Sequence, residues 1–510
     1  MKKILTIILD GFGYREEEKG NAIKAANMTF FNSLWQKYPH LCLEASEEAV
    51  GLAKGQAGNS EVGHMTIGAG RLLKQNEILV NEFLEEPPTD NKNYNTLLSM
   101  RDKDVHIMGL CSDGNIHAGV DDFLSMYNNL VHSGFTKIHF HVITDGRDTG
   151  VHDAMKYIDM LNEAINQTGI GDIATICGRY YAMDRDENYD RTKKYYNLVV
   201  GGIGQKFNSS FDAINYYYNN DITDEFMEPI RLNDIMIKDG DVLVWMNYRA
   251  DRAKQILDAF VNFKTFEKFR VLPMDNLSVF SFFTVDKRIK TLNLIEHPEV
   301  KNCLGLYLSE LDFTQARIAE SEKFPHVTYF FDGGVSGKIK GCDKFHIPSP
   351  SVATYDLKPE MSCVDVTKRV ILSMNNDYDF ILVNFANPDM VGHTGNMEAA
   401  TRACMAVDVC LNRILEKAEE NFYKVIILAD HGNADIMVNP DGSICTTHTT
   451  SLVPFILCDD KVKLKSSGSL VNVAPTILDY MDIAIPKEMS ETPSLLLKED
   501  WCFFFFCCKL

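Results

Sequence analysis

The sequence predicts an α/β protein whose sheets are mostly parallel. Apolar runs of strand length alternate along the chain with segments of helical periodicity, which is the pattern of parallel strands covered by helices. Several of these runs end directly in a polar side chain, as expected where an open α/β sheet binds a ligand at the carboxyl ends of its strands. The expected strands cover residues 4–9, 139–143, 242–246, 380–385 and 424–428.

Each predicted strand brings one polar residue to an edge of a sheet. In chain order, these residues are Asp10, Asp145, Asn247, Asn384 and Asp430. A polar residue at a strand end is most often the cap of a turn or of the following helix. Each residue alone is therefore a weak indication of a site, and a site can be identified only together with the surrounding motifs.

The composition restricts the partners of this chain. With 510 residues, two or three domains are expected, and 45% hydrophobic residues suffice for large cores. The formal net charge of −20 argues against a nucleic-acid partner, which requires a basic surface. An anionic substrate stays open, because a local arginine cluster can reverse the potential of one cleft. No apolar run reaches the length of a membrane span, so no membrane partner is expected.

A serine between glycines is the most distinctive local feature. Ser60 lies in the segment GNSEVGH, residues 58–64, which is too rich in glycine for an ordinary helix or strand. A serine hydroxyl is a poor nucleophile until a base or a metal ion activates it. The segment lacks the G-x-S-x-G pattern of the hydrolase elbow, which favours a metal ion over a Ser-His-Asp triad.

Aspartate and histidine residues occur in groups with the spacing of metal ligands. Asp389 and His393 are four residues apart, which places them on one face of a helix. Asp430 and His431 follow a predicted strand, and His448 lies in a threonine-rich loop. Mixed carboxylate and imidazole ligands suit Mn²⁺, Zn²⁺, Co²⁺ or Fe²⁺ better than Ca²⁺. Against the alternative of unrelated caps and core histidines, the whole set predicts a two-metal centre built from Asp10, Ser60, Asp389, His393, Asp430, His431 and His448.

Arginines are concentrated in three short motifs in the middle of the chain. These motifs are DGRDT at 145–149, GRYYAMDRD at 178–186 and NYRADRA at 247–253. Arginine side chains bind phosphate and carboxylate oxygens with two parallel hydrogen bonds, so the motifs predict an anion-binding site. The alternative is a network of surface ion pairs, because aspartates alternate with the arginines. The candidate cations are Arg147, Arg179, Arg185, Arg249 and Arg252, with Lys323 as one more.

The order of the motifs predicts a domain inserted into another domain. The expected metal ligands lie in residues 1–64 and 389–448, whereas the arginine motifs lie between them, at 147–252. One domain would then be interrupted by a second, with junctions near residues 73–76 and 295–302, where the periodic pattern is broken.

Taken together, the motifs resemble a known enzyme family. GNSEVGH, DGRDT, GRYYAMDRD, NYRADRA, EKFPHVTYFFDGG, ADHGNAD and THTT occur in this order, and the match extends from Leu9 to about Leu497. The sequence closely resembles the 2,3-bisphosphoglycerate-independent phosphoglycerate mutases of the alkaline phosphatase superfamily. Relatives that act as phosphatases, phosphodiesterases or phosphopentomutases share the metal-binding core, and a catalytically inactive scaffold is the remaining alternative.

The resemblance implies a fold and an activity. An alkaline-phosphatase-like domain with a mostly parallel sheet would comprise residues 1–75 and 299–510, and an inserted α/β phosphotransferase domain residues 76–298. The implied enzyme is an isomerase of glycolysis and gluconeogenesis that interconverts 3-phosphoglycerate and 2-phosphoglycerate through a phosphoserine. It would require two divalent ions, usually Mn²⁺, with Co²⁺, Zn²⁺ and Mg²⁺ as alternatives, and would be a monomer.

The resemblance also assigns roles to individual residues. Ser60 would accept the phosphoryl group, and Asp148 would transfer the proton of the substrate hydroxyl. One ion would be bound by Asp10, Ser60, Asp430 and His431, and the other by Asp389, His393 and His448. The implied substrate-binding residues are His117, Arg147, Asp148, Arg179, Arg185, Arg249, Arg252 and Lys323.

The sequence indicates a cytoplasmic protein. Its 13 cysteines are scattered without a C-x-x-C pair, as expected for reduced thiols in a reducing compartment. The segment Cys508-Lys509-Leu510 resembles the Ser-Lys-Leu signal of peroxisomes, but a packed or frayed terminus is the favoured interpretation, because three residues match easily by chance. Residues 498–510 match nothing in the family pattern, and Ala118-Gly119 after His117 replaces a usual Ser-His pair.

Overall fold

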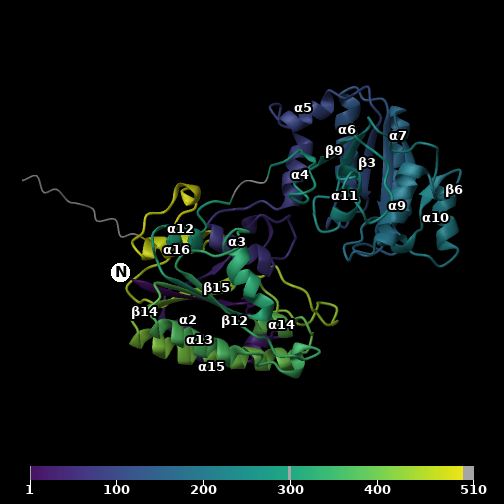
Figure 1. The fold of residues 1–510 in the computed structure, drawn as a ribbon. Helices are drawn as coiled ribbons and strands as arrows, with labels where there is room; N and C mark the ends of the chain where they lie inside the picture. Colours follow the sequence, from purple (N-terminus) through teal and green to yellow (C-terminus); the bar gives the residue numbers. More distant parts are fainter. Residues whose placement is uncertain (1, 297–299, 498–510) are drawn as a thin grey trace, which may run out of the picture. The chain divides into compact units, whose positions relative to one another are not determined.

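The computed structural model describes residues 2–296 and 300–497, which form two compact units (Figure 1). Unit 1 comprises Met1–Lys74 and Glu299–Leu510, and unit 2 comprises Gln75–Pro298. The first division of the chain falls between Lys74 and Gln75. The possible peroxisomal signal at Cys508-Lys509-Leu510 lies outside the described residues.

Unit 1 is built around a seven-stranded sheet in its described part. Its first five strands are mutually parallel, and the last two pairings are antiparallel. In spatial order the strands are β12 (Cys342–Ile347), β11 (Gln315–Glu320), β13 (Phe380–Phe385), β1 (Lys3–Leu9), β14 (Tyr423–Leu428), β15 (Val453–Leu457) and β2 (His40–Leu43).

The register of the central strands explains why distant acidic residues meet. On β1, Ile8 is paired with Leu428 of β14, and Leu9 is paired with Phe385 of β13. Because these strands run parallel, Asp10 and Asp430 each follow two residues after a paired position and emerge at the same edge of the sheet.

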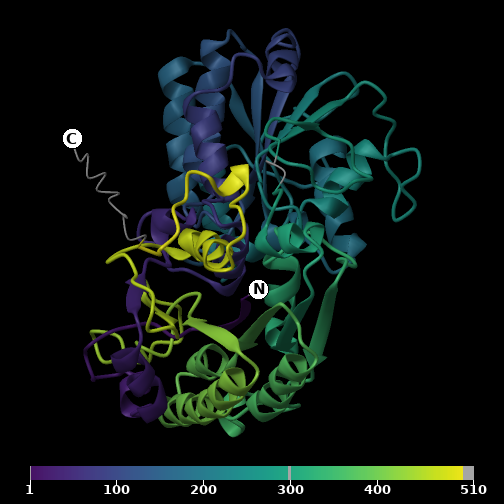
Figure 2. The ribbon, with the colours of Figure 1, turned by 90° about the vertical axis from the view of Figure 1, so that its left-hand side faces the viewer.

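Helices cover both faces of the unit 1 sheet (Figures 1 and 2). Both views show α2, α13 and α15 together on one face and α3, α12 and α16 on the other. The long helix α15 turns a row of apolar side chains, such as Ala403, Val407 and Leu411, toward the core. The helix ranges are α1 (Ala22–Ala25), α2 (Thr29–Lys37), α3 (Ser60–Ala69), α12 (Leu304–Glu310), α13 (Cys363–Asn375), α14 (Asn387–Gly392), α15 (Met397–Glu420) and α16 (Val473–Tyr480).

Unit 2 contains an eight-stranded sheet within the described residues. All of its pairings are parallel except that between β5 and β7. In spatial order the strands are β10 (Leu292–Asn293), β9 (Ser278–Ser281), β8 (Val242–Trp245), β3 (Val105–Leu110), β4 (Ile138–Thr144), β5 (Asp172–Gly178), β7 (Ile230–Arg231) and β6 (Gln205–Lys206).

The unit 2 sheet separates two hydrophobic cores. Residues of α4, α6, α7 and α10 line one core, whereas residues of α9 and α11 line the other. The helix ranges are α4 (Asn76–Glu85), α5 (Lys92–Leu98), α6 (Val120–His132), α7 (Ala154–Thr168), α8 (Arg179–Ala182), α9 (Tyr189–Gly201), α10 (Ser210–Tyr218) and α11 (Lys254–Val261).

The predicted fold class is confirmed. All five predicted strands are present, as parts of β1, β4, β8, β13 and β14, and both sheets are mostly parallel. Across residues 2–296 and 300–497, no helix combines the length and the apolar character needed to cross a bilayer.

Candidate active site

Ser60 is the first residue of α3, at the end of the glycine-rich segment. The side chain of Asn59 caps this helix by accepting a hydrogen bond from the backbone N–H of Val62 at 2.9 Å. A side chain at Gly63 would bring its Cβ within 2.7 Å of the carbonyl oxygen of Asp430. Glycine is therefore required there, because it lets the turn of Ser60 pack directly against the end of β14.

The Ser60 hydroxyl lies among charged side chains. Its Oγ is 3.2 Å from Oδ1 of Asp10, 2.9 Å from Nε2 of His431 and 2.6 Å from Nζ of Lys323. Only 5% of the residue is exposed. An anion approaching Ser60 would also meet the positive end of the ten-residue helix α3.

Lys323 connects the serine to two buried carboxylates. Its Nζ donates to Asp10 Oδ1 at 2.7 Å and to Asp389 Oδ2 at 2.5 Å. Burial opposes the charge of Lys323, but Asp10 and Asp389 raise its pKa above the usual value. Burial likewise acts to raise the pKa of Asp10, yet Lys323 holds it far below its ordinary range. Lys323, predicted from the sequence as a further cation for the substrate, lies in unit 1 and neutralises buried carboxylates there.

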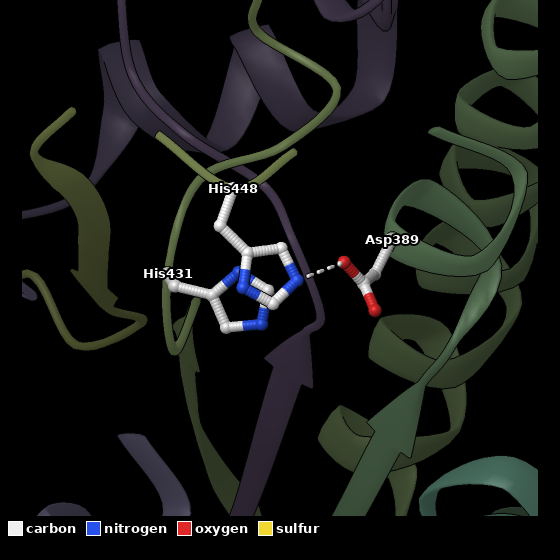
Figure 3. A group of neighbouring side chains, drawn as sticks. All are labelled: Asp389, His431 and His448. Atoms are coloured by element: carbon white, nitrogen blue, oxygen red, sulfur yellow. Dashed lines mark ion pairs between the residues drawn. The ribbon is translucent and has the colours of Figure 1, made fainter. Parts of the chain in front are cut away.

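The predicted ligands His431 and His448 lie beside Asp389 (Figure 3), and His393 contacts the same carboxylate. Oδ1 of Asp389 is 3.2 Å from Nε2 of His448 and 3.2 Å from Nε2 of His393. The rings of His431 and His448 overlap with centroids 4.0 Å apart. Asp389, His431 and His448 each offer a ligand atom, all within 4.8 Å of one another.

The structure thus brings all seven predicted ligands into one cluster, which we call the acidic nest. The nest consists of Asp10, Ser60, Asp389, His393, Asp430, His431 and His448.

The acidic nest fits divalent cations. Asp10, Asp389 and Asp430 are at most 1% exposed. Oδ2 of Asp430 is buried and lies 3.2 Å from Nδ1 of His64 and 3.5 Å from Nε2 of His431, and in the described ranges neither contact has hydrogen-bond geometry. Burial opposes a charge on His431, yet Asp430 and Asp10 raise its pKa to about 9, which shows how negative the nest is. Carboxylate and imidazole donors with this excess of negative charge are the ligands that Mn²⁺, Co²⁺ and Zn²⁺ accept.

Three neighbours of the nest were not assigned from the sequence. His64 lies one helical turn after Ser60 and has its Nδ1 2.9 Å from the carbonyl oxygen of Ser60. Nδ2 of Asn384 lies 2.6 Å from Oδ2 of Asp10 and 3.0 Å from Nε2 of His64. Because the amide nitrogen donates, Nε2 of His64 is the acceptor in this contact, and Nδ1 is left to donate to the Ser60 carbonyl oxygen.

Asn433 is the third neighbour, and its Nδ2 donates to Oδ1 of Asp389 at 2.8 Å. The sequence carried a signal for all three, since His64 and Asn433 lie within recognised motifs and Asn384 lies at a strand end. What the sequence could not show is which ligand each one contacts.

Unit 2 holds the predicted arginines at the carboxyl ends of its strands. Arg179, which is 3% exposed, donates from Nη1 to Asp145 Oδ1 at 2.6 Å and to Asp148 Oδ2 at 2.5 Å. Asp145 also accepts from Ser112 Oγ at 2.7 Å and from the backbone N–H of Asp148 at 3.0 Å. The carboxylates of Asp145 and Asp148 therefore hold the Arg179 guanidinium group. The Asp145 carboxylate also holds the backbone of Asp148 in place.

Asp251 connects further predicted binding residues. Its carboxylate is 3.0 Å from Arg185, 3.7 Å from Arg249 and 3.9 Å from Nδ1 of His117. Burial, together with the charge of Arg179, lowers the pKa of His117 to about 4, so this imidazole is neutral at pH 7. Asp251 is thus a shared partner of the guanidinium groups of Arg185 and Arg249.

Three of the predicted arginines in unit 2 remain accessible to a ligand. The side chains of Arg147, Arg185 and Arg249 are 49%, 49% and 52% exposed. Burial, followed by the charges of Arg179 and Arg185, lowers the pKa of Arg252, which shows a locally positive potential. Half-exposed guanidinium groups with a positive field can bind a phosphate or a carboxylate. We call Arg147, Arg179, Arg185, Arg249 and Arg252 the arginine cluster.

Comparisons with known proteins agree over nearly the whole chain. The Metalloenzyme superfamily matches residues 2–485. A 2,3-bisphosphoglycerate-independent phosphoglycerate mutase of Prochlorococcus marinus subsp. pastoris is 40% identical over 97% of this chain and 94% of that protein. One of Staphylococcus saprophyticus is 41% identical, with 95% and 97% covered.

A solved structure agrees with the sequence relatives. A crystal structure of Leishmania mexicana phosphoglycerate mutase, determined at low cobalt concentration, is similar with a TM-score of 0.69. It is 28% identical in sequence, and the similarity covers 98% of both chains. The chain therefore belongs to the Metalloenzyme superfamily and, within it, to the family of 2,3-bisphosphoglycerate-independent phosphoglycerate mutases.

Proposed function

We propose that this chain interconverts 3-phosphoglycerate and 2-phosphoglycerate without 2,3-bisphosphoglycerate, through a phosphoserine at Ser60. The position of the Ser60 hydroxyl carries this proposal. It is buried between Asp10, His431 and Lys323, in a nest whose donors fit divalent cations. The names of the relatives, which share about 40% of their residues with this chain, support the same reaction.

Two divalent ions belong to the proposal. Asp10, Ser60, Asp430 and His431 would bind one ion, and Asp389, His393 and His448 the other. Mn²⁺ is the ion that the family resemblance implies, and the donor set also accepts Co²⁺ and Zn²⁺, with Mg²⁺ as a further alternative. When bound, such ions lower the pKa of a coordinated hydroxyl and neutralise charge on phosphoryl oxygens.

The residues of the nest then carry the transfer. The Ser60 oxygen attacks phosphorus as the P–O bond to the substrate oxygen breaks, so that glycerate and phosphoserine form. Lys323 neutralises negative charge that develops next to the serine oxygen. The second hydroxyl of glycerate then attacks the phosphoserine, and the Ser60–phosphorus bond breaks. The phosphoryl group thus returns to glycerate at the other carbon.

Asp148 is the proposed proton carrier. With Ser60 reacting as its alkoxide, Asp148 would enter the step protonated and give that proton to the first substrate oxygen as it leaves. It would take a proton back from the second hydroxyl as that oxygen attacks, and the broken Ser60–phosphorus bond would leave the Ser60 oxygen as the alkoxide again. Its hydrogen bond with Arg179 and the backbone contact through Asp145 fix the carboxylate for this role.

The arginine cluster, together with His117, would hold the glycerate. Unit 2, approximated from the sequence as residues 76–298, is the proposed phosphotransferase and substrate-binding domain, and residues 1–75 with 299–510 form the metal-binding domain. The carboxylate and the phosphate of the substrate are both anions that guanidinium groups bind. Lys323 is the remaining proposed substrate-binding residue, and it would contact only the phosphoryl group of the substrate. We further expect a monomeric, cytoplasmic enzyme.

The test is the conversion of 3-phosphoglycerate by the purified chain with Mn²⁺ and without 2,3-bisphosphoglycerate. Phosphorus NMR would show 2-phosphoglycerate growing at constant total phosphoglycerate. Release of inorganic phosphate at a comparable rate would identify a phosphatase instead. An absence of turnover in protein that holds its metal would contradict the proposed activity.

A further inference from the structure

A buried carboxylate organises the segment that carries Arg185. Asp184 precedes Arg185 in the motif GRYYAMDRD, and its side chain is 2% exposed. No role in binding or transfer has been assigned to it above. The alternation of Asp and Arg in this motif is typical of an exposed ion-pair network, yet Asp184 lies inside unit 2.

Asp184 accepts hydrogen bonds from five donors. Its Oδ1 accepts from the backbone N–H groups of Asp186 at 3.1 Å and Asn188 at 2.9 Å, and from Nε2 of Gln255 at 2.9 Å. Its Oδ2 accepts from Nδ2 of Asn188 at 3.0 Å and from Nη1 of Arg191 at 3.1 Å.

Only an ionised carboxylate satisfies this environment. Each of the five partners donates, and a carboxylate is the side chain that accepts at both oxygens. Burial acts to raise the pKa of Asp184, but the hydrogen bonds of Asn188 and Gln255 lower it below the ordinary value. An asparagine here would turn an NH₂ group toward at least one donor, with no partner for it.

The contacts of Asp184 join three parts of unit 2. Asn188 and Arg191 belong to the start of α9, and Gln255 belongs to the first turn of α11. Gln255 is itself oriented, because Thr192 Oγ1 donates to its Oε1 at 3.0 Å. Arg191 lies over the ring of Tyr180, with its Cζ 3.9 Å from the ring centroid. The carboxylate therefore has little freedom to move relative to either helix.

The residues on both sides of Asp184 contact the arginine cluster. Met183 accepts, at its carbonyl oxygen, a hydrogen bond from Arg252 Nη1 at 2.9 Å. Arg185 is paired with Asp251 at 3.0 Å. Arg252 lies three residues before Gln255, so Asp184 fixes both the backbone that Arg252 contacts and the helix that follows Arg252.

We infer that Asp184 is a positioning residue, which sets the guanidinium groups of Arg185 and Arg252 for binding the anionic substrate. This inference rests on the proposed function, because it assigns these two arginines to phosphoglycerate. Within the described residues, Asp184 forms no hydrogen bond or ion pair with either guanidinium group, and it acts through the backbone and through Gln255. A merely structural role would change the stability of unit 2 but not the affinity for substrate.

The test compares Asp184→Asn with Asp241→Asn as a matched control. Asp241 is also a largely buried aspartate of unit 2, and it accepts from Lys238 N at 2.8 Å and contacts His106 at 3.2 Å. It precedes β8, whereas the arginines follow the carboxyl ends of the strands. The measurements are KM and kcat for 3-phosphoglycerate, the unfolding temperature, and the metal content of each protein.

For Asp184→Asn we expect KM to rise about 10-fold or more, because small displacements of binding groups have effects of this size. Asp241→Asn should keep KM within about 2-fold, even where its unfolding temperature falls, because it contacts no binding group. Metal content should stay unchanged in both. Asp184→Asn with the KM of the wild type would overturn the inference, as would an equal rise of KM in the control.

Two further arms keep the result interpretable. Should Asp184→Asn fail to fold, Gln255→Leu removes one donor and leaves the carboxylate, and it should raise KM in the same direction by a smaller factor. An unchanged KM in a folded Gln255→Leu protein would then overturn the inference. Wild-type protein without turnover overturns the proposed function as well, whereas an active wild type and an unaffected Asp184→Asn protein overturn only the inference.

Discussion

The acidic nest of unit 1 and the arginine cluster of unit 2 are opposite in charge, and the aspartates of the nest differ in exposure from three of the five arginines. Asp10, Asp389 and Asp430 are short side chains that are almost completely buried at the ends of strands or in the adjoining helix. Arg147, Arg185 and Arg249 are long side chains, each about half exposed. Buried carboxylates in excess favour the binding of cations, whereas exposed guanidinium groups favour the binding of an anion.

The comparison shows that the net charge of −20 describes neither site. Local charge decides what each unit binds, because Coulomb interactions are strongest where water is excluded. Lys323 marks the difference most clearly. It belongs to the nest, where a single ammonium contacts Asp10 and Asp389, and it is not part of the arginine cluster. The following variants test this contrast, in order of expected effect.

Ser60→Ala should abolish the chemistry and leave the nest intact. We expect mutase activity to fall on the order of 10⁴-fold or more, as for the loss of other covalent nucleophiles. The Asp and His ligands remain, so metal content by mass spectrometry should stay close to that of the wild type. Substantial residual activity would show that the phosphoryl group does not pass through this serine.

Lys323→Met should destabilise the metal-free protein by about 3–5 kcal/mol, because it leaves buried carboxylates without their ammonium partner. Saturating Mn²⁺ should reduce this loss, since the cation replaces the missing positive charge. Denaturant unfolding with and without a chelator measures both values.

Lys340→Met is the matched control, because Lys340 is an exposed lysine of the same unit that is paired with Asp312. It should change stability by less than about 1 kcal/mol under both conditions. An equal loss for Lys323→Met with and without Mn²⁺ would contradict the view that the nest is a cation site.

Arg252→Lys should impair the arginine cluster without unfolding unit 2. Lysine keeps the charge but loses the planar fork, so we expect kcat/KM to fall roughly 10- to 100-fold. The unfolding temperature should change little, and Arg288→Lys, at an exposed ion pair with Asp286, should be neutral in both respects. Equal losses of stability and activity would identify Arg252 as a structural residue.

Mild acid should weaken unit 2 through two buried histidines. His106 Nδ1 lies 2.9 Å from His141 Nε2, and His141 Nδ1 lies 2.8 Å from Thr175 Oγ1. Burial lowers the pKa of both histidines below the ordinary value of 6.5. The unfolded chain therefore binds protons that the folded unit does not, and stability is lost as the pH falls below about 6.5.

The expected loss is about 1–2 kcal/mol between pH 7 and pH 5.5, from roughly 1.4 kcal/mol per pH unit and histidine. Asp241 contacts His106 and limits the effect. His139 opposes it too, because Asp172 and Asp104 outweigh burial and raise its pKa. Hydrogen exchange of β3 and β4 amides reports unit 2 separately from metal loss in unit 1. Protection that is independent of pH, or unchanged by His141→Gln, would contradict this account.

The sequence predicted five strands that are mostly apolar and missed others, among them the apolar β15 (Val453–Leu457). β11, with the sequence QARIAE, is fully buried although it contains Gln315, Arg317 and Glu320. Arg317 is accommodated because its guanidinium lies over the rings of Phe331 and Phe380, at 4.4 and 5.2 Å from their centroids. Hydropathy alone could not identify this strand, because its polar side chains have partners that are distant in the sequence.

The site was predicted as a set of residues but not as a set of contacts. Motifs identified Ser60, Asp10 and His431, and parallel strand ends explained why they would meet. The same motifs gave no sign that Asn384 joins His64 to Asp10, since a strand-end asparagine has many uses. Asp184 was hidden in the same way, because an aspartate beside arginines in a sequence is usually exposed.

The sequence by itself determined the α/β class, the apolar runs that form the central strands, and the chemical types of the two sites. Those properties depend on local periodicity and on which side chains are present. Only the tertiary structure decided that Lys323 neutralises the acidic nest and that Asp184 is buried beneath the arginine motif. Burial and partner choice depend on strands and helices that are adjacent in space, and the charge state of an aspartate follows from those neighbours.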